Sequence, residues 1–486
     1  MLFRLLYDEK LAQAAYLIGC QRTGEAIIID PERDIDRYLA LAAKEKVRIT
    51  AITETHIHAD FLSGARELAE KTGAHLYLSA CGDADWQYQW LGRRTAGGSY
   101  AHTLVRDGDT FRVGNIEFKV IHTPGHTPEH ICFMVTDRGG GAAEPMGIVT
   151  GDFVFVGDVG RPDLLESAAG VAGAKEPSAR NLFHSLKRFG GLPEYLQVWP
   201  AHGAGSACGK ALGAVPQSTV GYEKRFNAAI RTTAEGENAF VSAILAGQPD
   251  PPLYFARMKR ENKMGPRVLG SLPRPGRLSI TEAAAIDAHV VTVIDTRPWK
   301  QFKAAHIPGA LWIPLDNMFP SVAGSFIGED ETIYLCTEGG PALDEAIRCL
   351  VRIGLDDVRA WIDPGDMEQV LAARPTASIK EIDVATARKE LDSPHSFLLD
   401  VRNESEFTEG HVPGASLTPY TRLADHIQEL PDHRAILVNC KAGGRSGRAC
   451  AFLKRAGFDV INLAGGFDAW AAAGAPVERE DAPARA

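Results

Sequence analysis

The segment Thr55-His-Ile-His-Ala-Asp60 places two imidazoles and a carboxylate within five positions. No apolar periodicity accounts for them, and imidazole and carboxylate groups are common ligands of transition metals. Three more polar groups follow in short motifs: His126 in Thr-Pro-Gly-His, Asp152 in Thr-Gly-Asp and His202 in Pro-Ala-His-Gly. These residue types indicate a metal centre.

Each of these polar groups follows an apolar run that is typical of a β-strand. The four runs are residues 47–52, 116–121, 146–150 and 198–201. Open α/β folds gather functional side chains at the carboxyl ends of their strands. Four such strand ends in one domain are difficult to explain by packing alone.

In order, these four motifs resemble the metal-binding loops of the metallo-β-lactamase superfamily, which implies an αββα sandwich. Gly157-Asp-Val-Gly-Arg161-Pro-Asp resembles the segment that follows the metal aspartate in persulfide dioxygenases. That resemblance implies one Fe(II) per chain, held by His56, His126 and Asp152. Two imidazoles and one carboxylate with open positions are the ligand set of non-haem Fe(II) oxygenases.

The residues around this set bear on the number of metals. A binuclear loop of this superfamily would carry a histidine at position 61, where this chain has Phe61. We therefore expect Asp60 and His202 to hold a second ion poorly. From the resemblance, Arg161 supports the pocket. Cys208, in a Gly-rich turn, is either an ordinary loop cysteine or a thiol at the mouth of the pocket that carries sulfane sulfur. Supporting or structural roles, rather than direct metal binding, are expected of His58, Asp60, His122, His130 and His184.

A second chemical motif is Cys440-Lys-Ala-Gly-Gly-Arg-Ser446, which leaves an apolar strand and enters a helix. Small residues let backbone N–H groups turn inward, and the helix N-terminus adds positive potential. Both favour a thiolate, and two basic side chains add charge. We expect Cys440 and Arg445 to be catalytic. The residues expected to bind substrate around them are Lys441, Gly443, Gly444 and Ser446.

The C-terminal half contains an internal repeat, because residues 295–310 recur as residues 400–415 with Asp, Arg, His and Gly at an offset of 105. These motifs resemble the rhodanese signature, and the Cys440 loop resembles the rhodanese active loop. The first repeat keeps Cys336 but has Glu338 and Pro341 in its loop. A nearby carboxylate opposes thiolate formation. We expect the first repeat to be catalytically silent.

Composition sets further limits. The chain has 486 residues, 45% hydrophobic and 23% charged, with a net charge of −10. These values are typical of a soluble globular protein and argue against nucleic acid or an anionic membrane surface as partner. Charge interrupts the N-terminal apolar run too early for a signal peptide, so a cytoplasmic protein is expected. Eight scattered cysteines without a CxxC motif argue against a disulfide scaffold.

The predicted organisation is an α/β multidomain chain. Its parts are a metallo-β-lactamase-fold domain at 1–250, a linker at 251–276, a degenerate rhodanese-like domain at 277–375 and an active one at 376–486.

We expect Fe(II)-dependent oxidation of a glutathione or coenzyme A type persulfide by O₂ to sulfite, coupled to sulfur transfer with sulfite or thiosulfate at Cys440. A homo-oligomer is expected. One alternative is a glyoxalase II-like zinc thioester hydrolase fused to a sulfurtransferase. Another is a non-enzymatic persulfide carrier or sensor.

Overall fold

The computed structural model describes residues 1–168, 170–248, 250–391 and 396–479. The chain forms two compact units, one of residues 1–272 with 351–354, and one of residues 273–350 with 355–486. Among the described helices, none combines the length and the apolar composition needed to cross a membrane.

Two six-stranded sheets build the first unit. The first sheet has the order β1 (Leu2–Asp8), β2 (Gln13–Cys20), β3 (Glu25–Ile29), β4 (Arg48–Thr53), β5 (His75–Ser79), β6 (His102–Val105). The second has the order β12 (Ser218–Thr219), β11 (Gln197–Pro200), β10 (Gly147–Gly151), β9 (Ile131–Asp137), β8 (Ile116–His122), β7 (Thr110–Val113). Strands β3 to β6 are parallel, so β3 and β4 end at the same edge of their sheet.

The strand sequences explain the layers of this unit. Alternate residues of a strand point to opposite faces, and both faces of β2 and β3 are apolar. Tyr16 and Ile27 pack against Phe133 of the second sheet. Leu17 and Ile28 pack on the other face, beneath the helices. The unit is therefore an αββα sandwich.

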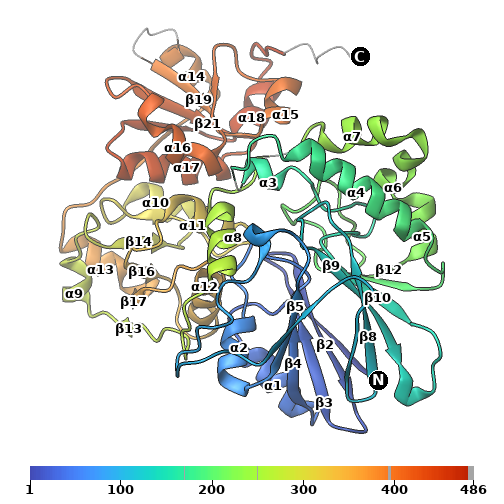
Figure 1. Ribbon diagram of the computed structural model, residues 1–486. Helices are drawn as coiled ribbons and strands as arrows, with labels where there is room; N and C mark the ends of the chain where they lie inside the picture. The colour runs from blue at the N-terminus through green and yellow to red at the C-terminus, as the bar shows by residue number, and fades with distance from the viewer. Residues whose placement is uncertain (169, 249, 392–395, 480–486) are drawn as a thin grey trace. The chain divides into compact units, whose positions relative to one another are not determined.

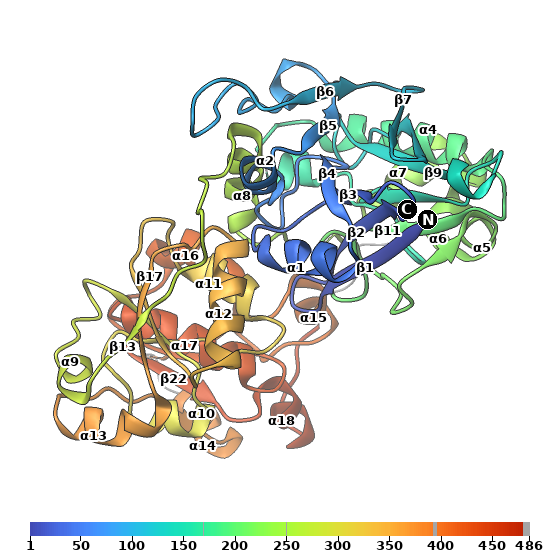
Figure 2. The same cartoon turned by 90° about the horizontal axis from the view of Figure 1, so that it is seen from below.

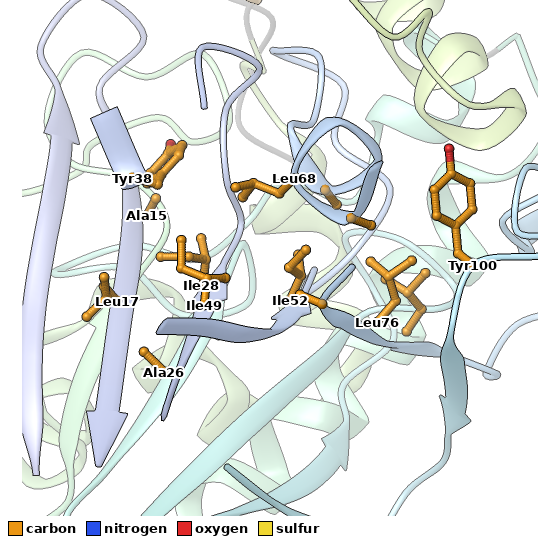
Figure 3. Packing of buried hydrophobic residues seen from close by; sticks show 14 of the residues in the cluster. Ala15, Leu17, Ala26, Ile28, Tyr38, Ile49, Ile52, Leu68, Leu76 and Tyr100 are labelled. Carbon is orange, nitrogen blue, oxygen red and sulfur yellow. The ribbon is translucent and has the colours of Figure 1, made fainter. Parts of the chain in front are cut away.

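Helices cover the two outer faces of the sandwich (Figure 1). Tyr38 of α1 (Asp36–Lys44) and Leu68 of α2 (Ala65–Thr72) pack over the first sheet, as Figure 3 shows. Leu182 of α4 (Lys175–Gly190) and Phe240 of α7 (Glu237–Leu245) pack against the second sheet. The shorter helices of this part are α3 (Leu164–Ser167), α5 (Val220–Phe226) and α6 (Ala228–Thr232).

The segment predicted as a linker contains a buried helix. Residues 254–264 form α8 (Tyr254–Met264), which buries Phe255, Met258 and Asn262 within the first unit. Arg66 of α2 donates to the carbonyl of Gly265 (3.1 Å), and Figure 2 shows α8 beside α2. The Pro- and Gly-rich stretches on either side of α8 produced the linker interpretation, although the helix between them is part of the domain.

The second unit contains the internal repeat as two parallel five-stranded sheets of the same order. The first repeat has the order β13 (Gly276–Arg277), β17 (Val358–Ile362), β16 (Ile333–Cys336), β14 (Thr292–Asp295), β15 (Leu311–Trp312). The second repeat has the order β18 (Lys380–Ile382), β22 (Val460–Leu463), β21 (Ala435–Asn439), β19 (Ser396–Asp400), β20 (Ser416–Leu417). This topology confirms the predicted fold class.

Helices connect the strands of both repeats. Those of the first repeat are α9 (Ile280–Ala284), α10 (Trp299–Ala304), α11 (Phe319–Phe326), α12 (Pro341–Arg352) and α13 (Met367–Ala372). Those of the second are α14 (Val384–Leu391), α15 (Glu404–Glu409), α16 (Leu423–His426), α17 (Gly444–Arg455) and α18 (Gly466–Ala472).

The repeated signature has a structural role. Arg297 pairs with Asp295 at 2.7 Å, and Arg402 pairs with Asp400 at the same distance. Each aspartate also accepts the backbone N–H of its arginine, so the pair fixes the turn that follows the strand.

Candidate functional site

Three of the predicted metal ligands lie together. His56, His126 and Asp152 follow β4, β8 and β10, and one ligand atom from each lies within 4.8 Å of the others. The Asp152 carboxylate is 3.4 Å from His126 Nε2 and 3.9 Å from His56 Nε2. All three side chains are buried.

Three of the potential ligand atoms of this group lack hydrogen-bond partners among the described residues. This is true of His56 Nε2 and of both carboxylate oxygens of Asp152, and all of these atoms are buried. A buried polar atom without a partner is costly and rare in folded proteins. A cation between these atoms would satisfy all three, so the residues fit a metal ion.

The protonation of the group also fits metal binding. Burial holds the pKa of His56 and of His126 well below the ordinary value, so both imidazoles are neutral. Burial raises the pKa of Asp152 to about 6, against the opposing effect of His202. Neutral imidazoles and a carboxylate are the forms that bind metals.

Asp30, which the sequence analysis did not single out, organises the first metal loop. It follows β3 and accepts hydrogen bonds from Thr55 N (2.7 Å), Thr55 Oγ1 (2.9 Å) and His58 Nε2 (3.2 Å). His56 Nδ1 lies 3.0 Å from Thr55 Oγ1, so it donates there and leaves Nε2 as the coordinating atom. Burial alone would lower the pKa of His58, but Asp30 raises it to about 9.

His130 and Arg161 position the other two ligands. His130 Nε2 accepts the backbone N–H of Asp152 at 3.1 Å, so the histidine predicted to be structural contacts a candidate ligand residue. The backbone oxygen of Arg161 accepts Nδ1–H of His126 at 3.0 Å. These contacts orient ligands in the way that partners of metal-bound histidines commonly do.

The side chain of Arg161 braces the pocket wall. It donates to both carboxylate oxygens of Asp163 (2.9 and 2.6 Å) and to the carbonyl of Ala207 (3.3 Å), next to Cys208.

Asn262 of α8 holds the first metal loop by three hydrogen bonds. Its amide donates to the carbonyls of His58 (2.9 Å) and Phe61 (2.7 Å), and its oxygen accepts the N–H of Ser63 (2.9 Å). The asparagine lies inside the predicted linker, so the sequence provided no signal for this contact.

A second buried group lies beside the first. Asp60, His202 and Cys208 each offer a ligand atom within 4.8 Å of the others. His202 Nε2 is 3.3 Å from a carboxylate oxygen of Asp60 and 3.3 Å from one of Asp152. His202 Nε2 and both oxygens of Asp60 have no hydrogen-bond partner among the described residues. The thiol of Cys208 thus supplies a donor that was not considered when Phe61 was taken to disfavour a second ion.

Cys208 lies inside the protein. It is 1% exposed, and burial followed by the charges of Asp60 and Asp152 raises its thiol pKa well above the ordinary value. The cysteine is therefore a neutral thiol unless a metal or another cation occupies the site.

A buried lysine from α8 adds positive charge to this region. Lys259 is 6% exposed, with its ammonium 4.5 Å from the ring centre of Trp86. Burial lowers the pKa of Lys259 to about 8, against the opposing effect of Glu129. Its charge also contributes to the lowered pKa of His126. Lys259 is therefore a buried cation beside the carboxylates of this region.

The cysteine cradle of the second unit lies between β21 and α17. Cys440 is 1% exposed, and its sulfur accepts the N–H of Gly443 at 3.1 Å and lies 3.4 Å from Ser446 Oγ. Gly443 has φ +98°, a conformation that favours glycine. A sulfur anion on Cys440 would meet this N–H and the positive end of the helix.

Backbone N–H groups at the start of α18 also hold the Cys440 loop. The N–H groups of Phe467 and Asp468 donate to the carbonyls of Cys440 (2.7 Å) and Lys441 (2.9 Å). Gly466 has φ +58°, and a Cβ there would lie 2.2 Å from the Cys440 oxygen. A side chain at position 466 would therefore displace the loop.

Of the two cationic residues predicted to surround Cys440, Arg445 is held by an ion pair and Lys441 faces solvent. Arg445 donates to both carboxylate oxygens of Glu406 (2.6 and 2.7 Å), and Lys441 is exposed. The sequence analysis did not single out Arg448, which is 6% exposed and lies one turn further along α17.

Comparison with known families matches residues 9–202 to the metallo-β-lactamase superfamily, and residues 281–362 and 383–473 to the rhodanese-like domain. A crystal structure of a metallo-β-lactamase from Staphylococcus aureus is 40% identical, with a TM-score of 0.66, and covers 75% of this chain and 99% of that chain. A match of that extent continues past residue 272 into the second unit.

Two curated relatives match separate parts. A sulfurtransferase of Allochromatium vinosum is 35% identical over 101 residues, which are 20% of this chain and 94% of that protein. A hydroxyacylglutathione hydrolase of Rhodospirillum rubrum is 31% identical over 187 residues, which are 38% of this chain and 60% of that protein.

Proposed function

We propose that this chain, which belongs to the metallo-β-lactamase superfamily and ends in two rhodanese-like domains, is a persulfide dioxygenase coupled to a sulfurtransferase. The observation that carries the proposal is that one chain contains both a buried two-His, one-carboxylate group and a cysteine cradle. The first is suited to a metal with open positions and the second to a sulfur anion. Both chemistries act on sulfane sulfur.

In the first unit, His56, His126 and Asp152 would hold one Fe(II). Bound there, iron would supply the O₂ chemistry that side chains lack. The reaction consumes a persulfide RSSH, O₂ and H₂O and yields the thiol RSH, sulfite and two protons. The sulfane sulfur is oxidised and O₂ is reduced.

The chain's own residues prepare this pocket. Asp30, His130 and the Arg161 carbonyl fix the loop and the ligand orientation. The ammonium of Lys259 would attract the persulfide anion. The thiol of Cys208 borders the ligand group and would contact the sulfane sulfur of the substrate.

In the second unit, the Cys440 thiolate would attack the outer sulfur of thiosulfate. A new S–S bond forms on Cys440, the bond to the SO₃ group breaks, and sulfite leaves with the electron pair. Attack by an acceptor thiolate on the outer sulfur of the Cys440 persulfide then gives RSS⁻ and restores the Cys440 thiolate. The Gly443 N–H and the start of α17 stabilise the sulfur anion at each stage.

Oxygen uptake by iron-loaded protein with glutathione or coenzyme A persulfide tests the first activity. We expect sulfite to form with uptake, and His126→Ala to reduce uptake by at least about a hundredfold. Cys440→Ser should leave persulfide-dependent uptake unchanged. Iron-loaded protein that consumes no oxygen with either persulfide would rule out the dioxygenase.

The second buried group and the hydrolase relative favour one alternative, a two-metal hydrolase of glutathione thioesters. The two groups would hold its metals, which would supply an activated water as the nucleophile. Elemental analysis and lactoylglutathione turnover separate the two functions. One iron per chain without turnover supports the dioxygenase, whereas two zinc ions with turnover support the hydrolase.

A further inference from the structure

We propose that the first repeat completes the anion-binding site of the second, with Trp312 and Asp316 holding Arg448 beside the Cys440 cradle. The ligand is a doubly charged sulfur oxyanion, thiosulfate or sulfite, which Arg448 binds and for which Asp316 competes. This inference rests on the sulfurtransferase part of the proposed function and assigns a role to the repeat expected to be silent.

The guanidinium of Arg448 lies near the start of α17. It lies four residues after Gly444, and helical side chains lean toward the N-terminus of their helix. A Cβ at Gly444 would be 3.7 Å from Nη1 of Arg448. The guanidinium therefore lies at the end of α17 where the cradle is built, although the residue itself is buried.

Residues of the first repeat hold this guanidinium. Its carbon is 5.6 Å from the ring centre of Trp312, and Nη2 is paired with the carboxylate of Asp316. A Cβ at Gly447 would lie 2.8 Å from the Trp312 ring and 3.3 Å from Trp299. Helix α17 therefore lies directly against the indoles of the first repeat.

Arg448 has hydrogen-bonding capacity left for a ligand. Its Nε is buried and has no hydrogen-bond partner among the described residues. Arg445, by contrast, makes two hydrogen bonds to Glu406. Arg448 therefore keeps an N–H group that can donate to an oxyanion, the kind of ligand that a guanidinium binds well.

Four charged or ionisable groups from the two repeats act on the phenol of Tyr420. Burial raises the pKa of Tyr420, Arg448 and Arg445 oppose that rise, and Asp316 and Cys440 add to it. The acidic residue of the first repeat and the nucleophile of the second therefore act on the same phenol.

Two substitutions have opposite expected effects on thiosulfate:thiol transfer. Asp316→Asn removes the competing charge and should lower the KM for thiosulfate about threefold, because partly exposed ion pairs are weak. Arg448→Gln should raise this KM about tenfold, as expected for loss of a charged hydrogen bond. Arg448→Lys should recover part of the loss.

Glu331→Gln is the matched control. Arg455, also on α17, pairs with Glu331 of the first repeat at 2.7 Å. This pair also joins the two repeats, but it lies at the far end of the helix. We expect Glu331→Gln to leave the KM unchanged. If Asp316→Asn raises the KM, or if Glu331→Gln changes it equally, the pair serves docking alone and the proposal fails.

A binding measurement separates this proposal from the proposed function. Calorimetric titration of thiosulfate or sulfite into Cys440→Ser protein needs no turnover. Absence of transfer by the unmodified protein would contradict the proposed function, while the titration would still test the site. Weaker binding in Arg448→Gln and tighter binding in Asp316→Asn support the site, and equal binding in all variants overturns it. Thermal unfolding shows whether each variant is folded.

Discussion

The two rhodanese-like repeats share one fold and differ in the surroundings of one cysteine. Cys336 is the last residue of the central strand β16, and Cys440 directly follows the central strand β21 of a sheet with the same strand order. Each repeat also has the same Asp–Arg pair after a neighbouring strand. The shared fold therefore cannot account for a difference in reactivity between the two thiols.

The residue before each cysteine differs between the two repeats. In the second repeat, Asn439 donates to the Asp400 carboxylate at 3.2 Å. The first repeat has Leu335 there, and burial together with Asp295 raises the thiol pKa of Cys336 well above the ordinary value. The amide of Asn439 stabilises the Asp400 carboxylate through this hydrogen bond, which a leucine at the same position cannot make.

The loop after each cysteine also differs between the repeats. Glu338 and Pro341 occupy the first loop, where the second has Ala442 and Arg445. The comparison teaches that two repeats with one scaffold can place different side chains around the same cysteine position. The first repeat retains its fold because, in our proposal, it forms one wall of the second site.

The strongest test of the comparison removes each sulfur in turn. Cys440→Ser should lower thiosulfate:thiol transfer by about a thousandfold or more, because the nucleophile is lost. Cys336→Ser should leave the transfer rate unchanged. Steady-state cyanide or thiol acceptor assays measure both, and equal losses would show that the repeats act together.

A carboxylate introduced into the Cys440 loop should give Cys440 the low reactivity that we expect of Cys336. Ala442→Glu places an acidic group at the position of Glu338, and a nearby negative charge raises a thiol pKa. Alkylation of Cys440 by iodoacetamide at pH 7 should slow about tenfold, which corresponds to about one pKa unit. The reciprocal Glu338→Ala should leave Cys336 slow, because Asp295 still opposes its thiolate; rapid alkylation of that variant would contradict this explanation.

Loss of the asparagine amide should have the smallest effect. Asn439→Leu leaves Asp400 without one donor, so the thiol pKa of Cys440 should rise. Transfer should fall about threefold at pH 7, where the thiolate fraction sets the rate, and return toward the unmodified rate above the new pKa. A rate that stays low at high pH would indicate a packing defect instead.

Much of the metal centre could be predicted because its ligands lie in short motifs at strand ends. The local motifs pointed to these strand ends, the family resemblance selected His56, His126 and Asp152 among them, and the structure brings the three together. Asp30 was missed because a single aspartate after an apolar strand resembles an ordinary turn residue. Its role depends on the parallel pairing of β3 with β4.

Other contacts could not be predicted from local sequence patterns. The pairing of Arg445 with Glu406 joins residues 39 positions apart, and that of Arg448 with Asp316 joins residues 132 positions apart. A loop motif shows which charges are present but not which carboxylates pair with them. Helix α8 was missed because Pro and Gly on both sides suggested a linker.

The contact made by Asn262 also orders events during synthesis. Its amide reaches the carbonyl of Phe61 across 201 residues of sequence. Domains form as the chain leaves the ribosome, N-terminal parts first. The loop that carries His56 therefore gains these contacts only after more than half of the polypeptide has been translated.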